Sequence, residues 1–364
     1  MRRRDFLLQC SATATSTLVA WPCARAAPPL PAWRTFEITT AVEVAAPSGR
    51  TQLWLPLPLS APSDYQRLLD SRWDAPGAAD AAVTAVPGYD VQLLRVEWPQ
   101  AAAVSRVTLT HRVATRDRAV NLAAAPLAPA AAQSASVLKN YLRPTALLPT
   151  DGIVATTAQR ICAARKGPID KAHAIYEWVV ENTTRDPKTP GCGMGDVGSM
   201  LRSGYLGGKC ADINALFVAL ARAAGIPARD AYGVRVADSR RGYQCLGRSG
   251  DISKAQHCRA EFYAAGYGWI PVDPADVRKV MLEEEPGGLP PSDPKVRAAR
   301  RALFGSWEMN WVAFNHGHDV ALPGSTHGAI PFLMYPNAET GAERLNSLDP
   351  AGFRYGIQAR ELAG

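Results

Sequence analysis

The chain has 364 residues, of which 47% are hydrophobic and 20% are charged, and its formal net charge is +7. This composition agrees with a globular protein that has ample material for a core, and the length suggests two domains. No run of basic residues occurs beyond the first 26 residues, so the charge gives no case for a nucleic-acid partner.

The first 26 residues predict a twin-arginine signal peptide. Three consecutive arginines at positions 2–4 precede a mildly apolar run, and a small-x-small cleavage site ends at Ala26. The run is too short and too rich in Ser and Thr to stay in a bilayer, and no later segment reaches spanning length. We therefore expect cleavage after Ala26, a periplasmic location and no stable membrane span; a disordered basic tail is the alternative. Cleavage would lower the net charge to +4, because it removes four arginines and one aspartate.

Residues 27–118 are expected to form an N-terminal antiparallel β-sandwich domain. Apolar side chains alternate here with period two, as in strands with one buried face, and turn residues punctuate the alternation. The alternating positions are Phe36, Ile38, Thr40, Val42 and Val44, then Leu53, Leu55 and Leu57, then Val91 and Leu93, and finally Val107, Leu109, His111 and Val113. This domain would brace or shape a neighbouring domain, or present it to a partner.

An Ala/Pro-rich linker is predicted at residues 119–135, and a second domain follows at 136–280. The apolar spacing predicts helices at 153–165 and 170–182. A long glycine-bearing loop comes next, at 183–208, and is a candidate wall for a cleft because loops often carry function.

A cysteine in the first turn of a helix is the most informative feature of the chain. Gly207 and Gly208 lead to Cys210, and an apolar stripe with the i, i+3, i+4, i+7 spacing of a buried helix face begins at Ile213. The stripe consists of Ile213, Leu216, Phe217, Leu220 and Ala224, and the helix is ended by Gly225 and Pro227. Free backbone N–H groups and the positive end of the helix dipole favour a thiolate there, and the thiolate is the nucleophilic form. The alternative is that Cys210 is a small buried hydrophobic residue.

A predicted hairpin brings a histidine to an aspartate. Its strands are 257–263 and 267–273, and they are joined by a three-residue loop that ends in Gly266, which suits the left-handed position of such loops. This register places His257 directly opposite Asp273 on one face, with Cβ atoms about 5 Å apart. The imidazole Nδ1–H would then donate to the carboxylate.

Two further features surround this hairpin. A strand at 232–236 and a polar loop at 239–254 precede it, and the loop is either a lid or an ordinary surface loop. Pro271 lacks an N–H group, so its strand lies at a sheet edge or contains a bulge.

Residues 281–364 are expected to form a β-rich extension that completes the core. The stretch Asn315-His316-Gly317-His318-Asp319 invites a metal-site interpretation, but no third set of ligands with suitable spacing is visible nearby. We therefore predict no metal, and no cofactor is expected.

Five of the seven cysteines lie beyond the predicted signal peptide. If Cys210 stays free, the other four allow three disulfide pairings in an oxidising compartment. These four are Cys162, Cys192, Cys245 and Cys258. The pair Cys245–Cys258 is preferred because the two residues flank one loop, and free cysteines are the alternative.

Four segments resemble the transglutaminase-like superfamily, whose members are relatives of papain-type cysteine enzymes. The segments lie within residues 150–280 and read IYEWVVENT, GMGDVGSML, GGKCADINALFVALARAAGIPARDAYGVRV and QHCRAEFYAAGYGWIPVDPADV. The resemblance implies an α+β fold in which the cysteine helix packs against an antiparallel sheet. It also implies that Cys210 is the nucleophile, His257 the general base and acid, and Asp273 the residue that orients the imidazole. Family members often have a small residue and then Trp after the histidine, whereas Cys258 and Arg259 follow here, so we expect a different substrate pocket.

The expected chemistry is acyl transfer at an amide bond. The Cys210 thiolate would attack the carbonyl, form a thioester, and pass the acyl group to water or to an amine. The Cys210 backbone N–H is one oxyanion donor, and Gln256 and Tyr205 are the candidates for the second. We expect an enzyme that acts on cell-envelope peptides or proteins, more by hydrolysis than by cross-linking. A catalytically silent binding or scaffold module and a cysteine-based redox protein are the alternatives, and the oligomeric state is left open.

Overall fold

The computed structural model describes residues 32–363 except 46, 62, 101–103, 125, 127–132 and 350–352. The predicted signal peptide lies outside the described residues, and so does part of the predicted linker. Within the described part of the chain, no helix is long and apolar enough to cross a membrane.

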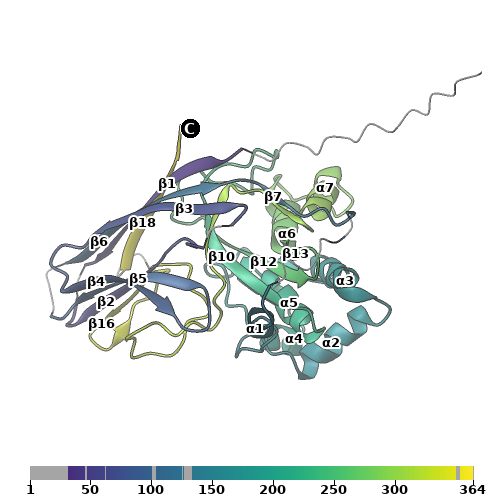
Figure 1. Cartoon of the computed structure of the whole chain (residues 1–364), viewed down its shortest axis with the longest axis horizontal. Coiled ribbons are helices and arrows are strands. Elements are labelled where there is room, and N and C mark those ends of the chain that lie inside the picture. Colours follow the sequence, from purple (N-terminus) through teal and green to yellow (C-terminus); the bar gives the residue numbers. More distant parts are fainter. Residues whose placement is uncertain are drawn as a thin grey trace, which may run out of the picture. The chain divides into compact units, whose positions relative to one another are not determined.

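Two five-stranded antiparallel sheets form the predicted sheet-rich region (Figure 1). Their strand orders are β11-β18-β1-β6-β3 and β17-β16-β2-β5-β4. Apolar side chains of both sheets share one core, which includes Val42 and Val107 from the first sheet and Leu53 and Leu94 from the second. The strands are β1 (Arg34–Val44), β2 (Thr51–Pro56), β3 (Gln66–Asp74), β4 (Asp80–Val86), β5 (Val91–Trp98), β6 (Ser105–Thr115), β11 (Gly250–Asp251), β16 (Asn337–Thr340), β17 (Glu343–Arg344) and β18 (Phe353–Leu362).

The alternation pattern misses β3 and β4, which lie at the edges of the two sheets. Most of their side chains are exposed or half-buried, and Leu69, Trp73 and Val83 are large apolar side chains that remain exposed. A strand without a well-buried face has no reason to alternate apolar and polar residues, so the period-two signal is lost.

A four-stranded antiparallel sheet with helices packed against it forms the predicted α+β core (Figure 1). We call it the core sheet; its order is β13-β12-β10-β15, with β13 at an edge, as Pro271 indicates. Helix α5 packs against β12 and β10, and it is buried on all sides from Cys210 to Arg222. The strands of the core sheet are β10 (Ala228–Arg235), β12 (Gln256–Ala264), β13 (Gly268–Val272) and β15 (Trp311–Asn315).

Six further helices and two small sheets complete the described elements. The other helices are α1 (Ala135–Asn140), α2 (Gly152–Cys162), α3 (Gly167–Asn182), α4 (Val197–Ser203), α6 (Pro274–Glu283) and α7 (Pro294–Ala302). The small sheets pair β7 (Arg118–Ala119) with β14 (Ser306–Trp307), and β8 (Thr184–Arg185) with β9 (Gly207–Gly208).

The segment 281–364 is divided between the two parts of the fold. Strand β15 joins the core sheet, whereas β16, β17 and β18 join the sandwich. The pairing of β18 with β1 is long, running from Thr35 opposite Leu362 to Val44 opposite Phe353.

The long strands β1 and β18 each contribute to two hydrophobic cores. At one end, Val42 and Phe353 pack inside the sandwich. At the other end, Phe36 and Ile357 pack in one cluster with Val234 of β10. The sandwich therefore supports the core sheet through shared apolar burial, which stabilises by about 25 cal/mol per Å² of buried apolar surface.

Gly233 on β10 lies directly opposite His257 of β12. The pairing of β10 with β15 is irregular at this point. A Cβ atom on Gly233 would lie 2.1 Å from the carbonyl oxygen of Val312 and 2.6 Å from the ring of Trp311. The close approach of β15 therefore requires glycine here.

We expect Gly233→Ala to lower the free energy of unfolding by about 1–3 kcal/mol, because overpacking forces the backbone to shift. Gly328→Ala is the matched control, since nothing lies within 4 Å of its Cβ position. Urea unfolding followed by circular dichroism measures both variants. Equal free energies of unfolding for the two would contradict the packing argument.

Candidate active site

Cys210 is the first residue of α5, and the side chain of Asp212 fixes the start of this helix. The Asp212 carboxylate accepts the N–H group of Lys209 at 2.9 Å and those of Met194 and Gly195 at 3.0 and 2.9 Å. At the first helical position, the Cys210 N–H has no acceptor within the helix. The thiol therefore lies where free N–H groups and the helix dipole favour negative charge.

Two glycines make room for this carboxylate. A Cβ atom on Gly193 would lie 1.8 Å from an oxygen of Asp212, and one on Gly208 would lie 2.4 Å from an oxygen of the same group. Gly208, the second of the two glycines before Cys210, thus reflects close approach to Asp212, whereas Gly207 approaches the ring of Tyr205.

The predicted register of the hairpin is wrong, although His257 and Asp273 do form the predicted hydrogen bond. Ala264 lies opposite Gly268, two residues out of the predicted register, because the loop is centred one residue later, on Gly266 with φ of +81°. A shift of two residues keeps the same face of the strand turned toward its partner. Asp273 consequently reaches His257 from just beyond the end of β13.

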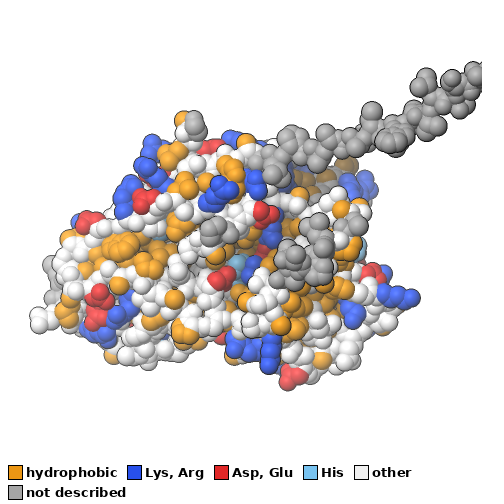
Figure 2. Space-filling view, viewed as in Figure 1, with side chains coloured by type: hydrophobic (Ala, Val, Ile, Leu, Met, Phe, Trp, Pro, Cys, Tyr) orange, Lys and Arg blue, Asp and Glu red, His pale blue; other side chains and the backbone are white. Residues whose placement is uncertain are grey.

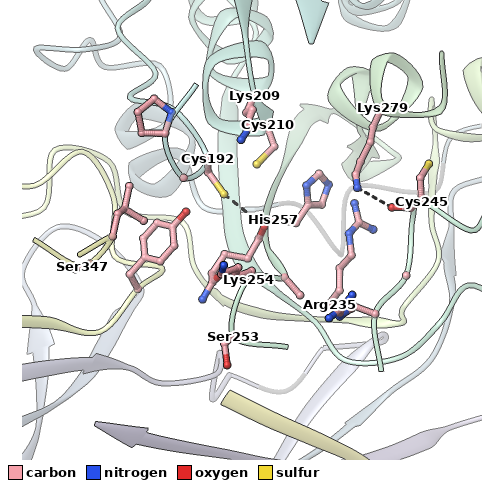
Figure 3. Close-up of a pocket in the computed structure, with 18 of the residues that line it drawn as sticks. Cys192, Lys209, Cys210, Arg235, Cys245, Ser253, Lys254, His257, Lys279 and Ser347 are labelled. Atoms are coloured by element: carbon pink, nitrogen blue, oxygen red, sulfur yellow. Dashed lines mark hydrogen bonds between the residues drawn. The ribbon is translucent and has the colours of Figure 1, made fainter. Parts of the chain in front are cut away.

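Asp273 is the N-cap of α6, where its Oδ1 accepts the N–H of Asp276 at 3.0 Å. Its Oδ2 lies 2.7 Å from His257 Nε2. The predicted contact atom, Nδ1, is therefore wrong. The use of Nε2 leaves Nδ1 for the Cys210 thiol, which lies beside the imidazole ring in Figure 3.

Three side chains that the sequence analysis missed hold this histidine–aspartate couple. Asp276 Oδ1 lies 3.3 Å from His257 Nε2 and accepts a hydrogen bond from Arg235 Nη2 at 2.6 Å. Asn214 Nδ2 donates to Asp273 Oδ1 at 3.3 Å. The sequence signal for Asp276 is an aspartate N-cap followed by proline and then by an acid three residues later. Asn214 lies one helical turn after Cys210 on α5, a spacing that places the two side chains on one face of the helix. No local signal exists for Arg235, because tertiary packing brings it to the site.

Three thiols cluster at the site. The Sγ atoms of Cys192, Cys210 and Cys258 all lie within 4.8 Å of one another. All five described cysteines are free, so the predicted Cys245–Cys258 disulfide is wrong. The carbonyl oxygen of Gln256, 3.4 Å from the Cys192 sulfur, is the alternative acceptor for the single proton of that thiol.

The surroundings favour the thiolate form of Cys210. Hydrogen bonds from Cys192 and Cys258, together with the neighbouring His257, lower the pKa of Cys210 well below its ordinary value against the effect of burial. The bond to Cys210 raises the pKa of Cys192, and burial raises that of Cys258. The negative charge belongs on Cys210 because, of the three thiols, only this one lies at the N-terminus of a helix.

The imidazole is correspondingly held in its charged form. Burial and the Arg235 guanidinium lower the pKa of His257, but Asp276 and Asp273 outweigh them and raise it to about 9. The two shifts together favour a thiolate–imidazolium pair, the reactive form of a cysteine nucleophile.

Cys210 and His257 line a cleft of about 890 Å³ (Figure 3). The relative exposure of Cys210 is 4%, so the cleft is its access to solvent. Gln256 also lines the cleft, and its Nε2 is buried without a hydrogen-bond partner in the described chain. Tyr205 does not line the cleft, and its hydroxyl donates to Asp186 at 2.9 Å. Of the two oxyanion candidates, Gln256 alone lies on the cleft.

Arg259 lies behind the couple. Its guanidinium stands over the ring of Trp311 at 4.7 Å, and its Nε lies 3.7 Å from Asp273 Oδ2. Burial lowers the pKa of Arg259 to about 10, so it stays charged at neutral pH. Neither Cys258 nor Arg259 is among the described residues that line the cleft.

Among the described residues, two groups of side chains are close enough to hold a metal ion: the three thiols, and His257 with Asp273 and Asp276. The two carboxylates already accept hydrogen bonds from neighbouring protein groups, whereas thiols suit soft ions. The histidines of the 315–319 stretch belong to neither group, and His316 Nδ1 lies 2.6 Å from a carboxylate oxygen of Asp90.

A cysteine at the start of a buried helix, with an imidazole–carboxylate couple on the sheet behind it, defines the class of transglutaminase-like and papain-like cysteine enzymes. Residues 155–274 match the model of the Transglutaminase-like superfamily. An uncharacterized protein from Haemophilus influenzae is 38% identical over 343 residues, which cover 90% of this chain and 91% of that protein. The chain belongs to the transglutaminase-like superfamily.

A solved structure of low sequence identity shares the fold. A proposed cysteine protease from Cytophaga hutchinsonii superimposes with a TM-score of 0.56 at 15% identity, covering 92% of each chain. The periplasmic domain of TgpA from Pseudomonas aeruginosa matches with a TM-score of 0.36 at 15% identity, covering 71% of this chain and 93% of that domain.

The charge state of His257 can be tested directly. Its pKa of about 9 means that the imidazole keeps its proton through neutral pH and loses it as the pH rises through that value. We expect Asp276→Asn to lower this pKa, because a neighbouring negative charge that favours the imidazolium is removed. Titration of the His257 ring by NMR measures the shift, with Asp70→Asn on the exposed strand β3 as control. An unchanged midpoint in Asp276→Asn would contradict the assigned role of Asp276.

Proposed function

We propose that the protein is a cysteine hydrolase that cleaves amide bonds in peptides or proteins through a thioester on Cys210. The observation that carries this proposal is the placement of Cys210 and His257 on one cleft, with His257 held by Asp273 at 2.7 Å. The fold, which is that of a family of cysteine-dependent enzymes, supports it.

In the first half of the reaction, the Cys210 thiolate attacks the amide carbonyl carbon, and the carbonyl π electrons move to oxygen. The Cys210 N–H and the Gln256 Nε2–H group donate to this oxyanion, and loss of one such donor costs about 100-fold or more in rate. His257 gives its proton to the leaving nitrogen as the C–N bond breaks. The amine departs, and the acyl group stays on sulfur as a thioester.

In the second half, the neutral His257 accepts a proton from water as the oxygen attacks the thioester carbon. The C–S bond breaks, the acid leaves, and Cys210 returns to the thiolate while His257 returns to the imidazolium. Asp273 keeps the ring oriented through both steps and stabilises its positive charge. An amine in place of water would give a cross-linked amide by the same steps.

Cys192 and Cys258 act in this scheme as positioning residues. Their pKa values are raised, so both stay protonated beside the Cys210 thiolate. Hydrogen bonds to a charged group favour the charged form, so these two thiols stabilise the nucleophile before substrate arrives.

The predicted signal peptide places this chemistry in the periplasm, so the proposed substrates are cell-envelope peptides or proteins. The test has two parts, run on separate samples: profiling of peptide amides by mass spectrometry, with and without an added primary amine, and labelling of Cys210 by iodoacetamide at neutral pH. Release of the free acid supports the proposed hydrolase. An amine adduct would reassign the protein as a cross-linking enzyme, and labelling no faster than that of a free thiol would identify a silent binding module.

Replacement of the nucleophile should separate activity from folding. We expect Cys210→Ala to lower turnover at least about 1,000-fold, because no thioester can form, with the melting temperature nearly unchanged. Cys162→Ala is the matched control, since Cys162 does not line the cleft. Normal turnover by Cys210→Ala would end the proposal.

The two members of the couple should differ in their importance. We expect His257→Ala to be more harmful than Asp273→Asn, whose loss in kcat should be about 100- to 10,000-fold, because the base is retained and only its orientation suffers. Asparagine is also a good N-cap, so Asp273→Asn should keep the start of α6 intact. Steady-state kinetics on the peptide found by profiling gives the ranking, and the reverse order would count against these roles.

A further inference from the structure

The cleft carries an excess of positive charge. Among the described residues that line it, six are basic and none is acidic. The basic residues are Arg185, Lys209, Arg235, Arg248, Lys254 and Lys279. On the face of the molecule in Figure 2, by contrast, Lys and Arg side chains lie in small groups among acidic and neutral ones.

Three of these cations are neutralised by carboxylates that do not themselves line the cleft. Arg235 pairs with Asp276 at 2.6 Å. Arg185 and Lys279 both pair with Glu283, and the Lys279 Nζ also donates to the carbonyl oxygen of Cys245 at 2.9 Å.

The other three cations have no carboxylate at ion-pair distance in the described part of the chain. Lys209 immediately precedes Cys210, and Arg248 donates only to the backbone carbonyl of Asp251, at 3.0 Å. Lys254 is exposed on the segment before β12. In Figure 3, Lys209 lies on one side of the Cys210–His257 pair and Lys254 on the other. Lys209 and Lys254, neither of which forms a close ion pair, therefore flank the reacting pair in this view. The carboxylates of Asp186 and Asp251 lie near enough to offset this positive charge in part.

A buried donor in the same cleft also lacks an acceptor. Gln256 is 91% buried, and its Nε2 has no hydrogen-bond partner in the described chain. A buried amide donor without an acceptor is costly unless a ligand supplies an oxygen atom. In the proposed mechanism the oxygen of the attacked amide supplies that acceptor, so the charge preference of the cleft rests on the lysines and arginines.

We propose that the acyl-donor substrate is a peptide with carboxylate groups close to the bond that is attacked. The inference rests on the proposed function, since it names the substrate class of the same site. A cleft lined by charges of one sign concentrates oppositely charged ligands and raises their association rates by about tenfold or more. Peptides rich in lysine would be repelled by the same field.

A pair of small alkylating agents tests the charge preference without any knowledge of the substrate. Iodoacetate is anionic and iodoacetamide is its neutral isostere, and both alkylate Cys210 at sulfur with release of iodide. We expect the ratio of the iodoacetate rate to the iodoacetamide rate to exceed that of a free thiol. The excess should shrink as salt rises, because the Debye length falls to about 3 Å at 1 M.

Matched variants separate the effect of the cleft cations on this rate ratio from that of the His257 imidazolium, which also attracts iodoacetate. We expect the double variant Arg248→Gln with Lys254→Gln to lower the rate ratio by about tenfold, because the unpaired charges at the cleft are removed. Lys139→Gln, on the exposed face of α1, should leave the ratio unchanged. An unaltered ratio in the double variant would overturn the inference, whereas slow labelling of Cys210 by both agents would count against the proposed function instead.

Peptides identify the source of the carboxylate. The series carries Glu, Gln or Lys beside the cleaved amide, each with a free or an amidated C-terminus. We expect kcat/KM to be about tenfold higher for Glu than for Gln, and lowest for Lys. Dependence on the free C-terminus instead would assign the terminal carboxylate as the recognised group. Cleavage of the Gln and Lys peptides at rates equal to or above that of the Glu peptide, whether the C-terminus is free or amidated, would overturn the proposal.

Discussion

The Asp212 carboxylate accepts three backbone N–H groups from two segments that meet at Cys210. A further bond, from the Ala211 N–H to the Cys192 carbonyl oxygen at 2.9 Å, joins the same segments. The nucleophile and its neighbouring thiol are therefore placed by one local set of contacts. Burial raises the pKa of Asp212, and its three backbone hydrogen bonds offset this effect only in part. The glycines around it, the start of α5 and the geometry of the thiol cluster all depend on this side chain.

The site buries an unusual number of charges behind that nucleophile. Asp273 and Asp276 face His257, Arg235 and Arg259, and all five side chains are buried. With Cys210 as thiolate, three negative charges balance three positive ones. Removal of one member leaves a buried charge unpaired, which typically costs about 3–5 kcal/mol, whereas an apolar replacement of a whole buried network is often neutral. Such a network therefore does not by itself indicate a stabilising role. The presence of these buried charges fits a functional role for the charged imidazole.

Local patterns predict much of the fold and part of the site. The apolar stripe predicts α5, and the period-two alternation predicts β1, β2, β5 and β6 but not the exposed edge strands. Cys210, His257 and Asp273 lie together as expected, although the hairpin register is wrong by two residues. A glycine marks a turn, but the hydrogen bond that closes the turn sets the register, and that bond depends on the packed sheet. Arg235 and Cys192 come from other segments, so no local pattern indicates their place in the site, whereas Asn214 lies one helical turn after Cys210 on α5.

The pairing of β1 with β18 determines how early the chain can finish folding during its synthesis. Arg34 and Glu361, which are 327 residues apart, form an ion pair across these strands. Strand β1 therefore gains its second neighbouring strand, β18, only after residue 362 has been synthesised. Contacts of such sequence separation slow folding. Val234 and Val312 of the core sheet pack in one hydrophobic cluster with residues of β1 and β18. A catalytic fragment without these two strands would expose both valines. Nascent chains of this architecture need protection until translation is nearly finished.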